Sequence, residues 1–167
     1  MEQRDPWYII DNASEVTSPS LLVYPDRIES NIQSMIGIAG GADRLRPHVK
    51  THKTSRIVKM QMDLGIGKFK CATISEMEMA AVCGAGDILL AFQPVGPNLE
   101  RFFRLKSTFP GTVISCIVDS EQTAVQLSDM SVQSGQETGV YIDMNNGMNR
   151  TGILPGENEP FTPKPVK

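Results

Sequence analysis

Short apolar runs alternate with segments of helical periodicity along most of the chain, and this alternation limits the fold more than any other feature. Strand-like runs are predicted at residues 20–24, 45–50, 69–73, 87–92, 113–119 and 139–145. Apolar residues at helical spacing predict helices at 26–36, 55–64, 75–84, 98–107 and 120–134. Strands that are separated by single helices pair in parallel through right-handed crossovers. The chain is therefore expected to be an α/β protein with a parallel sheet.

Two architectures fit this order of elements, an open doubly wound sheet and an eight-fold (β/α) barrel. The 167 residues could complete an open sheet, whereas a complete barrel needs about 250. Residues 1–156 are expected to form one domain. Residues 157–167 are rich in proline and are expected to be a tail or linker without packed structure.

Composition excludes several classes of function. The net charge of -3 gives no general attraction to nucleic acid or to an anionic membrane. Cys71, Cys83 and Cys116 are widely spaced, so we expect neither a zinc ribbon nor a disulfide framework, and each is expected to be a small buried residue. No apolar run approaches the length of a membrane span, and the first residues lack a signal-peptide core. A cytoplasmic protein without nucleic-acid or membrane partners is predicted.

The segment RPHVKTHK, residues 46–53, contains both histidines of the chain together with three of its cations. On a strand, alternation would place Arg46, His48, Lys50 and His52 on one face. Pro47 removes one hydrogen bond from the ladder, so an irregularity is expected there.

Four interpretations of this segment compete. It could be a solvated basic strand end. His48 and His52 could bind a metal, although their spacing suits a helix and no Asp, Glu or Cys close by completes a site. A nucleic-acid contact lacks interleaved aromatic residues. Finally, neighbouring cations and burial would disfavour the ammonium form of a lysine such as Lys50, and a neutral lysine can form a Schiff base with a carbonyl.

Three ordered blocks carry a resemblance to a known family: RPHVKTHK, then KFKCATISEMEMAAVCGAGDILLAFQPVGP at 68–97, then YIDMNNGMNRTGI at 141–153. They resemble the D-threonine aldolase and D-serine dehydratase family, whose members are pyridoxal-phosphate enzymes with an alanine-racemase-like barrel. The resemblance covers nearly all of residues 18–156. It implies a (β/α) TIM-type barrel, present here for about five βα units, with the C-terminal β-domain of the family absent.

The resemblance also implies roles for individual residues. Lys50 matches the lysine that binds the cofactor covalently, whereas the residues alone did not exclude Lys53. Arg150 matches an arginine beside the phenolic oxygen of the cofactor. Thr73 and Gln93, at strand ends, are expected to contact the cofactor at the barrel rim. Lys50 and His52 are the predicted catalytic residues, with His52 handling a proton. Because Arg46, His48 and His52 share the strand face of Lys50, they are expected to surround it, and His48 is expected to contact the cofactor. Asp143 is expected to orient Arg150 or to serve as a structural carboxylate.

The implied function is a pyridoxal-phosphate lyase that cleaves D-3-hydroxy amino acids to glycine and an aldehyde, as D-threonine aldolase does. A dehydratase, a non-catalytic cofactor-binding barrel and an unrelated open α/β binding module remain alternatives. The family uses a divalent metal such as Mn or Zn, bound by its C-terminal domain, so no metal ligand is predicted in this chain. The resemblance implies a homodimer for the full-length form, and the present chain is expected to be an incomplete fragment.

Overall fold

The sheet consists of four parallel strands in the order in which they occur along the chain. The computed structural model describes residues 6–154. Its strands are β1 (Lys68–Cys71), β2 (Asp87–Leu90), β3 (Val113–Val118) and β4 (Gly139–Ile142). Its helices are α1 (Pro25–Ala39), α2 (Ser55–Asp63), α3 (Ile74–Val82), α4 (Pro97–Thr108) and α5 (Glu121–Ser134). Three short 3-10 turns are η1 (Ala13–Glu15), η2 (Ala42–Arg44) and η3 (Val49–Thr51).

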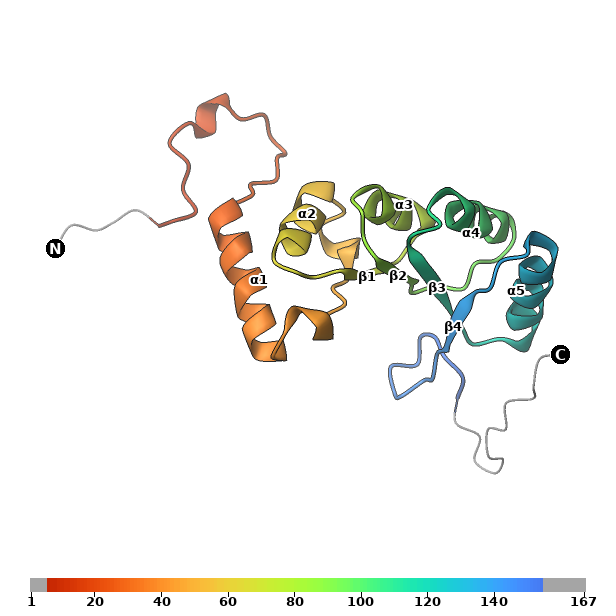
Figure 1. Cartoon of the computed structure of the whole chain (residues 1–167). Coiled ribbons are helices and arrows are strands. Elements are labelled where there is room, and N and C mark those ends of the chain that lie inside the picture. Colours follow the sequence, from red (N-terminus) through yellow and green to blue (C-terminus); the bar gives the residue numbers. More distant parts are fainter. Residues whose placement is uncertain (1–5, 155–167) are drawn as a thin grey trace.

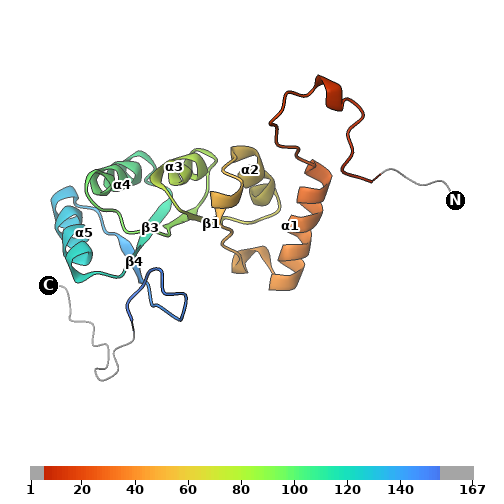
Figure 2. The same cartoon turned by 180° about the vertical axis from the view of Figure 1, so that it is seen from behind.

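The sequential strand order decides between the two architectures that the sequence left open. A doubly wound sheet reverses its strand order and carries helices on both faces. Here the order is β1-β2-β3-β4 without a reversal, and helices α2 to α5 follow one another along the same side of the strands (Figures 1 and 2). This arrangement is that of consecutive units of a (β/α) barrel. The barrel fold that the resemblance implied is confirmed.

Alternation along the strands produces the apolar core. In β1, β2 and β3, fully or almost fully buried side chains occur at alternate positions: Phe69, Cys71, Ile88, Leu90, Ile114 and Cys116. They belong to one cluster with buried residues of the helices, including Val58, Met77, Phe102 and Leu127. The intervening positions form the opposite face, on which Lys70, Leu89, Ser115 and Gly139 share one register. One face of the sheet therefore holds the fold together, and the other can carry polar groups.

The prediction of a strand at residues 20–24 is wrong. This segment is extended but pairs with no strand in the part of the chain that the structure describes, and Leu21 is 88% exposed. An apolar run becomes a strand only where a neighbour completes its hydrogen bonds. The following helix was predicted correctly, with Ile32 buried. It begins one residue earlier than predicted, with Tyr24 as its N-cap and Pro25 at the first helical position.

The prediction of a strand at 45–50 holds for one residue pair only. His48 forms an isolated parallel bridge with Lys70, and the Lys70 amide donates to the Pro47 carbonyl at 2.8 Å. The chain then turns into η3, where the sequence predicted continued extension. Other strands are one to three residues shorter at their carboxyl ends than predicted; β4, for example, ends at Ile142.

We predict that Phe69→Ala lowers the free energy of unfolding by about 3–5 kcal/mol, because the Phe69 ring is 0% exposed and its removal leaves a cavity. Urea unfolding followed by circular dichroism measures the change. Phe92→Ala is the matched control, since Phe92 is 56% exposed, and it should change the stability by less than about 1 kcal/mol. Equal losses in the two variants would contradict this account of the core.

Candidate active site

Lys50 lies where the segment preceding β1 leaves the sheet at the carboxyl ends of the strands. His48 pairs with Lys70 of β1, and η3 begins directly afterwards. Val49 is completely buried and anchors the turn in the core, whereas Lys50 beside it is exposed. Among residues 6–154, no carboxylate pairs with the Lys50 ammonium group and no side chain accepts a hydrogen bond from it. Its amine is therefore open to a ligand.

The side chains of both histidines bind backbone amides of the segment that contains Lys50. The Nδ1 atom of His48 accepts a hydrogen bond from the Lys50 amide at 3.3 Å, which caps η3. The Nδ1 atom of His52 accepts one from the Thr54 amide at 3.2 Å. Such local bonds from a side chain to the backbone compete with a sheet ladder. They explain why the chain turns after His48.

Burial favours the neutral form of both imidazoles by lowering the pKa of each. It lowers the pKa of His48, with further lowering by the positive charges of Lys50 and Lys70. It also lowers the pKa of His52, against the raising effects of the Thr54 backbone and of Glu76. Since Nδ1 of His52 accepts a hydrogen bond, its proton resides on Nε2. That atom is buried and has no hydrogen-bond partner among the described residues.

Glu76 of helix α3 binds Lys53, which lies just after η3. One of its carboxylate oxygens pairs with the Lys53 ammonium group, and the other accepts from the Ala72 amide at 2.7 Å. Burial alone would raise the pKa of Glu76, but the hydrogen bonds from Lys53 and Ala72 outweigh it and hold the pKa below its usual value. Lys53 has a positive φ of 49°. Of the two lysines that the residues alone left open, Lys53 is thus the one whose charge is already neutralised.

Arg46 lies at the other end of the sheet. Its guanidinium group forms a two-pronged ion pair with Asp87, with Nη1–Oδ1 and Nη2–Oδ2 distances of 2.7 and 2.5 Å. Asp87 is the first residue of β2. The structure therefore gives Arg46 a structural partner at the amino end of the strands, in place of the position around Lys50 that the strand pattern suggested.

Thr73 and Gln93 lie near each other at the ends of β1 and β2, as predicted. Both line a hollow of about 450 Å³ together with Ser75, Asn98 and Arg101. Their polar atoms already have partners. The Thr73 hydroxyl accepts from the Glu76 amide at 3.2 Å and caps α3, while the Gln93 side chain bonds to Asp119.

Arg150 lies in the loop that follows β4. The guanidinium is exposed and has no side-chain partner within the described part of the chain. Asp143 uses its backbone groups, donating to Val118 and accepting from Ile153 at 2.8 Å each. No hydrogen bond or ion pair between the Asp143 carboxylate and Arg150 is present among residues 6–154. The contact expected between them is not observed.

Sequence reasoning did not single out Glu76 and Asp119. Glu76 stands three residues after the cap Thr73, which is the spacing of a capping box, and this signal could have identified it. Asp119 directly follows β3 and accepts from the Gly152 amide at 3.0 Å. Its position at a strand end was the available signal.

The side chains present fit an aldehyde cofactor. Lys50 offers an unpaired primary amine, and the buried Nε2–H of His52 lacks an acceptor, which a polar ligand would supply. A resident metal has no comparable support within residues 6–154, where no group of three or more His, Cys, Asp or Glu side chains could hold an ion.

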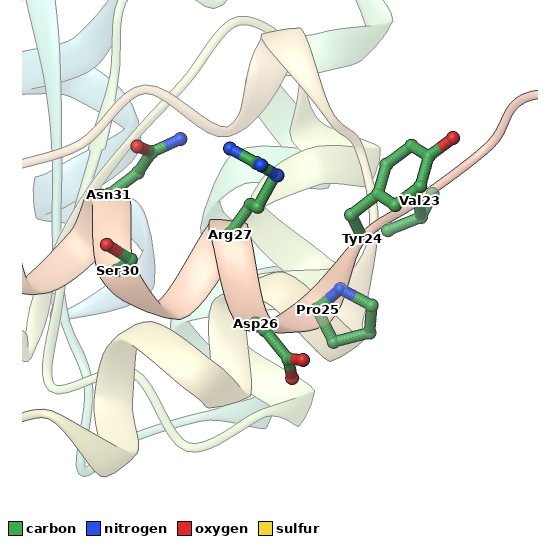
Figure 3. Close-up of a pocket in the computed structure, with 7 residues that line it drawn as sticks. All are labelled: Val23, Tyr24, Pro25, Asp26, Arg27, Ser30 and Asn31. Carbon is green, nitrogen blue, oxygen red and sulfur yellow. The ribbon is translucent and has the colours of Figure 1, made fainter. Parts of the chain in front are cut away.

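Two other features lie apart from this rim. A hollow of about 450 Å³ surrounds the start of α1, where Arg27 and Asn31 project to the same side of the helix (Figure 3). The Arg27 guanidinium stacks 3.6 Å from the centre of the Trp7 ring.

Burial raises the pKa of the Cys71 and Cys116 thiols to about 12, so these cysteines are inert packing residues, as predicted. No helix of the described chain is both long and apolar enough to cross a membrane.

A sequential parallel sheet with an open lysine at the carboxyl ends of its strands defines a barrel of the class that binds small molecules at that rim. Comparison with known proteins identifies the family. The profile described as alanine racemase, N-terminal domain, matches residues 23–161, and the chain belongs to this family.

Relatives with established names are similar over most of the chain. A 3-hydroxy-D-aspartate aldolase of Paracoccus denitrificans is 32% identical over 148 residues, and a D-threonine aldolase of Arthrobacter sp is 31% identical over 144 residues. Each match covers 86% of this chain and 38% of the relative. A D-threo-3-hydroxyaspartate dehydratase of Delftia sp. is 27% identical over 144 residues, which are 86% of this chain and 37% of the relative.

Solved structures show the same similarity. The crystal structure of D-threonine aldolase from Filomicrobium marinum superposes with a TM-score of 0.77 at 31% identity, over 87% of this chain and 39% of that chain. The dehydratase from Delftia sp. HT23 gives a TM-score of 0.72 at 27% identity, over 83% and 36%. The present chain therefore spans less than two fifths of the length of these relatives.

We predict that Glu76→Gln lowers the free energy of unfolding at pH 7 by about 1–3 kcal/mol, because an amide replaces a charged acceptor of two hydrogen bonds. Glu76 has a folded pKa below its ordinary value of 4.5, so its contribution is complete above that pH and is lost as the pH falls through the folded pKa. Urea unfolding at several pH values measures the difference between the two proteins.

The exposed Glu78 on the same helix provides the control, and Glu78→Gln should leave stability within about 0.5 kcal/mol of the parent. A Glu76→Gln difference that stays constant between pH 7 and pH 3 would show that the carboxylate charge is not what stabilises this contact.

Proposed function

We propose that this chain supplies the cofactor-binding rim of a pyridoxal-phosphate-dependent lyase that cleaves D-3-hydroxy amino acids to glycine and an aldehyde, in the manner of D-threonine aldolase. The observation that supports the proposal most directly is the position of Lys50. Its amine is unpaired at the carboxyl ends of the strands, while the neighbouring Lys53 is held by Glu76. The similarity to two aldolases supports the reaction.

Pyridoxal phosphate, when bound, supplies an aldehyde that condenses with amines and a conjugated ring that accepts the electrons of the broken bond. Lys50 would hold this cofactor through its primary amine, which can form a Schiff base with a carbonyl. In the short turn η3, Lys50 directly follows the buried Val49, and its backbone amide donates to the side chain of His48. The chain thus presents the amine on a fixed backbone.

His52 carries its proton at Nε2. We propose that this N–H donates a hydrogen bond to the β-hydroxyl oxygen of the substrate or to another acceptor of the bound ligand. Its Nδ1 bond to Thr54 fixes the ring in this tautomer. Proton removal by His52 would require that bond to break. Burial and the positive charges of Lys50 and Lys70 lower the pKa of His48, which favours its neutral form beside Lys50.

Arg150 is proposed to donate to the phenolic oxygen of the cofactor, where a permanent positive charge favours the ionised oxygen. Thr73 and Gln93 are proposed to line the rim next to it. Both side-chain polar atoms of Gln93 are engaged by Asp119, so we expect Gln93 to shape the site. The Thr73 hydroxyl accepts from the Glu76 amide and keeps its own O–H for donation to the ligand.

Dehydration is the second candidate reaction, supported by the 27% identity to the Delftia dehydratase. The products distinguish the two. The complete protein, incubated with pyridoxal phosphate, a divalent metal and D-threonine, should release glycine and acetaldehyde. Release of ammonia and a 2-oxo acid would identify the dehydratase, and cofactor binding with no product would indicate a non-catalytic barrel.

A divalent metal, Mn or Zn, is proposed to assist the substrate hydroxyl. The relatives extend far beyond the matched region, and we assign the metal ligands to that further part. One solved relative, a variant of the Delftia dehydratase, is described as a metal-free form. We further propose a homodimer that works in the cytoplasm on small D-amino acids.

The identity of the reactive lysine can be tested by borohydride reduction of the complete protein with bound pyridoxal phosphate, followed by peptide mapping. We expect the label on Lys50 and its loss in Lys50→Arg, because a guanidinium group keeps the charge but cannot condense with the aldehyde. Lys53→Arg is the matched control. It preserves a cation for Glu76 and should keep the label at Lys50.

Label that persists in Lys50→Arg and disappears in Lys53→Arg would transfer the role to Lys53. Label that persists in both variants would refute the assignment of this turn as the site of cofactor attachment.

A further inference from the structure

Asp119 joins three separate parts of the rim. One carboxylate oxygen accepts from the side-chain amide of Gln93, which follows β2, and the other accepts from the backbone amide of Gly152 at 3.0 Å. The Asp119 amide in turn donates to the side-chain oxygen of Gln93 at 3.1 Å. Asp119 itself directly follows β3. It therefore connects the ends of two strands to the loop that follows a third.

The loop at 145–152 is shaped by its own hydrogen bonds. The side-chain oxygen of Asn145 accepts from the amides of Gly147 and Asn149 at 3.0 and 3.1 Å. The Asn145 amide donates to the Ile153 carbonyl at 2.9 Å and closes the loop at its base. Gly152 has a φ of +98°, and a Cβ there would lie 2.5 Å from the Asn145 nitrogen. Only glycine fits where the two ends of the loop meet.

These internal bonds determine the conformation of the loop but not its orientation over the sheet. The bonds of Asp143 to Val118 and Ile153 hold only the base, next to β4. The bond from Gly152 to Asp119 crosses from the loop to the end of β3. Arg150, two residues before Gly152, has an exposed side chain without a described partner. Its location therefore follows from where the backbone of this loop is held.

We propose that Asp119, braced by Gln93, is a positioning residue that holds the 145–152 loop over the strand ends and so places Arg150 at the cofactor. This inference rests on the proposed function of Arg150. It also gives Gln93 a definite part, since both polar atoms of its side chain are used to orient the Asp119 carboxylate.

An exchange of donor and acceptor between the two positions tests the link. Asp119→Asn leaves a single side-chain acceptor for two donors, and Gln93→Glu opposes two carboxylates. When both substitutions are combined, the introduced asparagine can donate to the introduced glutamate and still accept from the Gly152 amide. The introduced glutamate still accepts from the backbone amide of residue 119. All three hydrogen bonds and the net charge are then restored.

Hydrogen exchange of the cofactor-free complete protein gives a readout that is independent of activity. We expect the Gly152 amide to exchange about tenfold faster in each single variant and to return to the parent rate in the double variant. Asp129→Asn, an exposed change on α5, is the control and should have no effect. An unchanged rate in Asp119→Asn, or no recovery in the double variant, would overturn the proposal.

The dissociation constant of pyridoxal phosphate then tests the connection with Arg150. Asp119→Asn should weaken binding by about tenfold in the parent, and should have little additional effect in an Arg150→Ala background. An equal loss in both backgrounds would show that Asp119 does not act through Arg150. The borohydride experiment on Lys50 stands apart from these measurements, so failure of the loop anchor and failure of the cofactor assignment give different results.

Discussion

The structure depends on one apolar layer between the parallel strands and their helices. β1, β2 and β3 place side chains such as Phe69, Ile88 and Ile114 under the helices, where burial stabilises the fold. The carboxyl ends of the strands do not belong to this layer, so polar side chains can occupy them. Lys50 is exposed at the rim, while its neighbour Val49 is fully buried in the core.

Polar side chains that bind backbone amides give the rim its form. His48, Thr73 and Asp119 each accept a hydrogen bond from an amide in a turn or at the start of a helix. These bonds satisfy donors that the ends of strands and helices leave open. The same residues stand beside the groups proposed to bind the cofactor. Much of the polar character that marks the site in the sequence therefore serves to hold loops in place.

The sequence predicted the helices and the parallel pairing, because periodicity reports directly on which side chains face the core. It failed at 20–24, where an apolar run lacks a partner strand, and at His48, whose side chain diverts the backbone into a turn. The choice of Lys50 over Lys53 in the sequence rested on the resemblance and remains a proposal. The engagement of Lys53 by Glu76, and of Gly152 by Asp119, joins residues 23 and 33 positions apart and depends on tertiary packing that local pattern does not encode.

The unbroken strand order also bears on how the molecule is made. Among residues 6–154, β2, β3 and β4 each pair with the strand that precedes them in the chain, so none of these four strands has to be inserted between two others. Contacts of this kind span short stretches of chain and carry a small entropic cost of loop closure. The fold can accordingly grow from the amino end, one strand and helix at a time, while the ribosome is still synthesising the remainder.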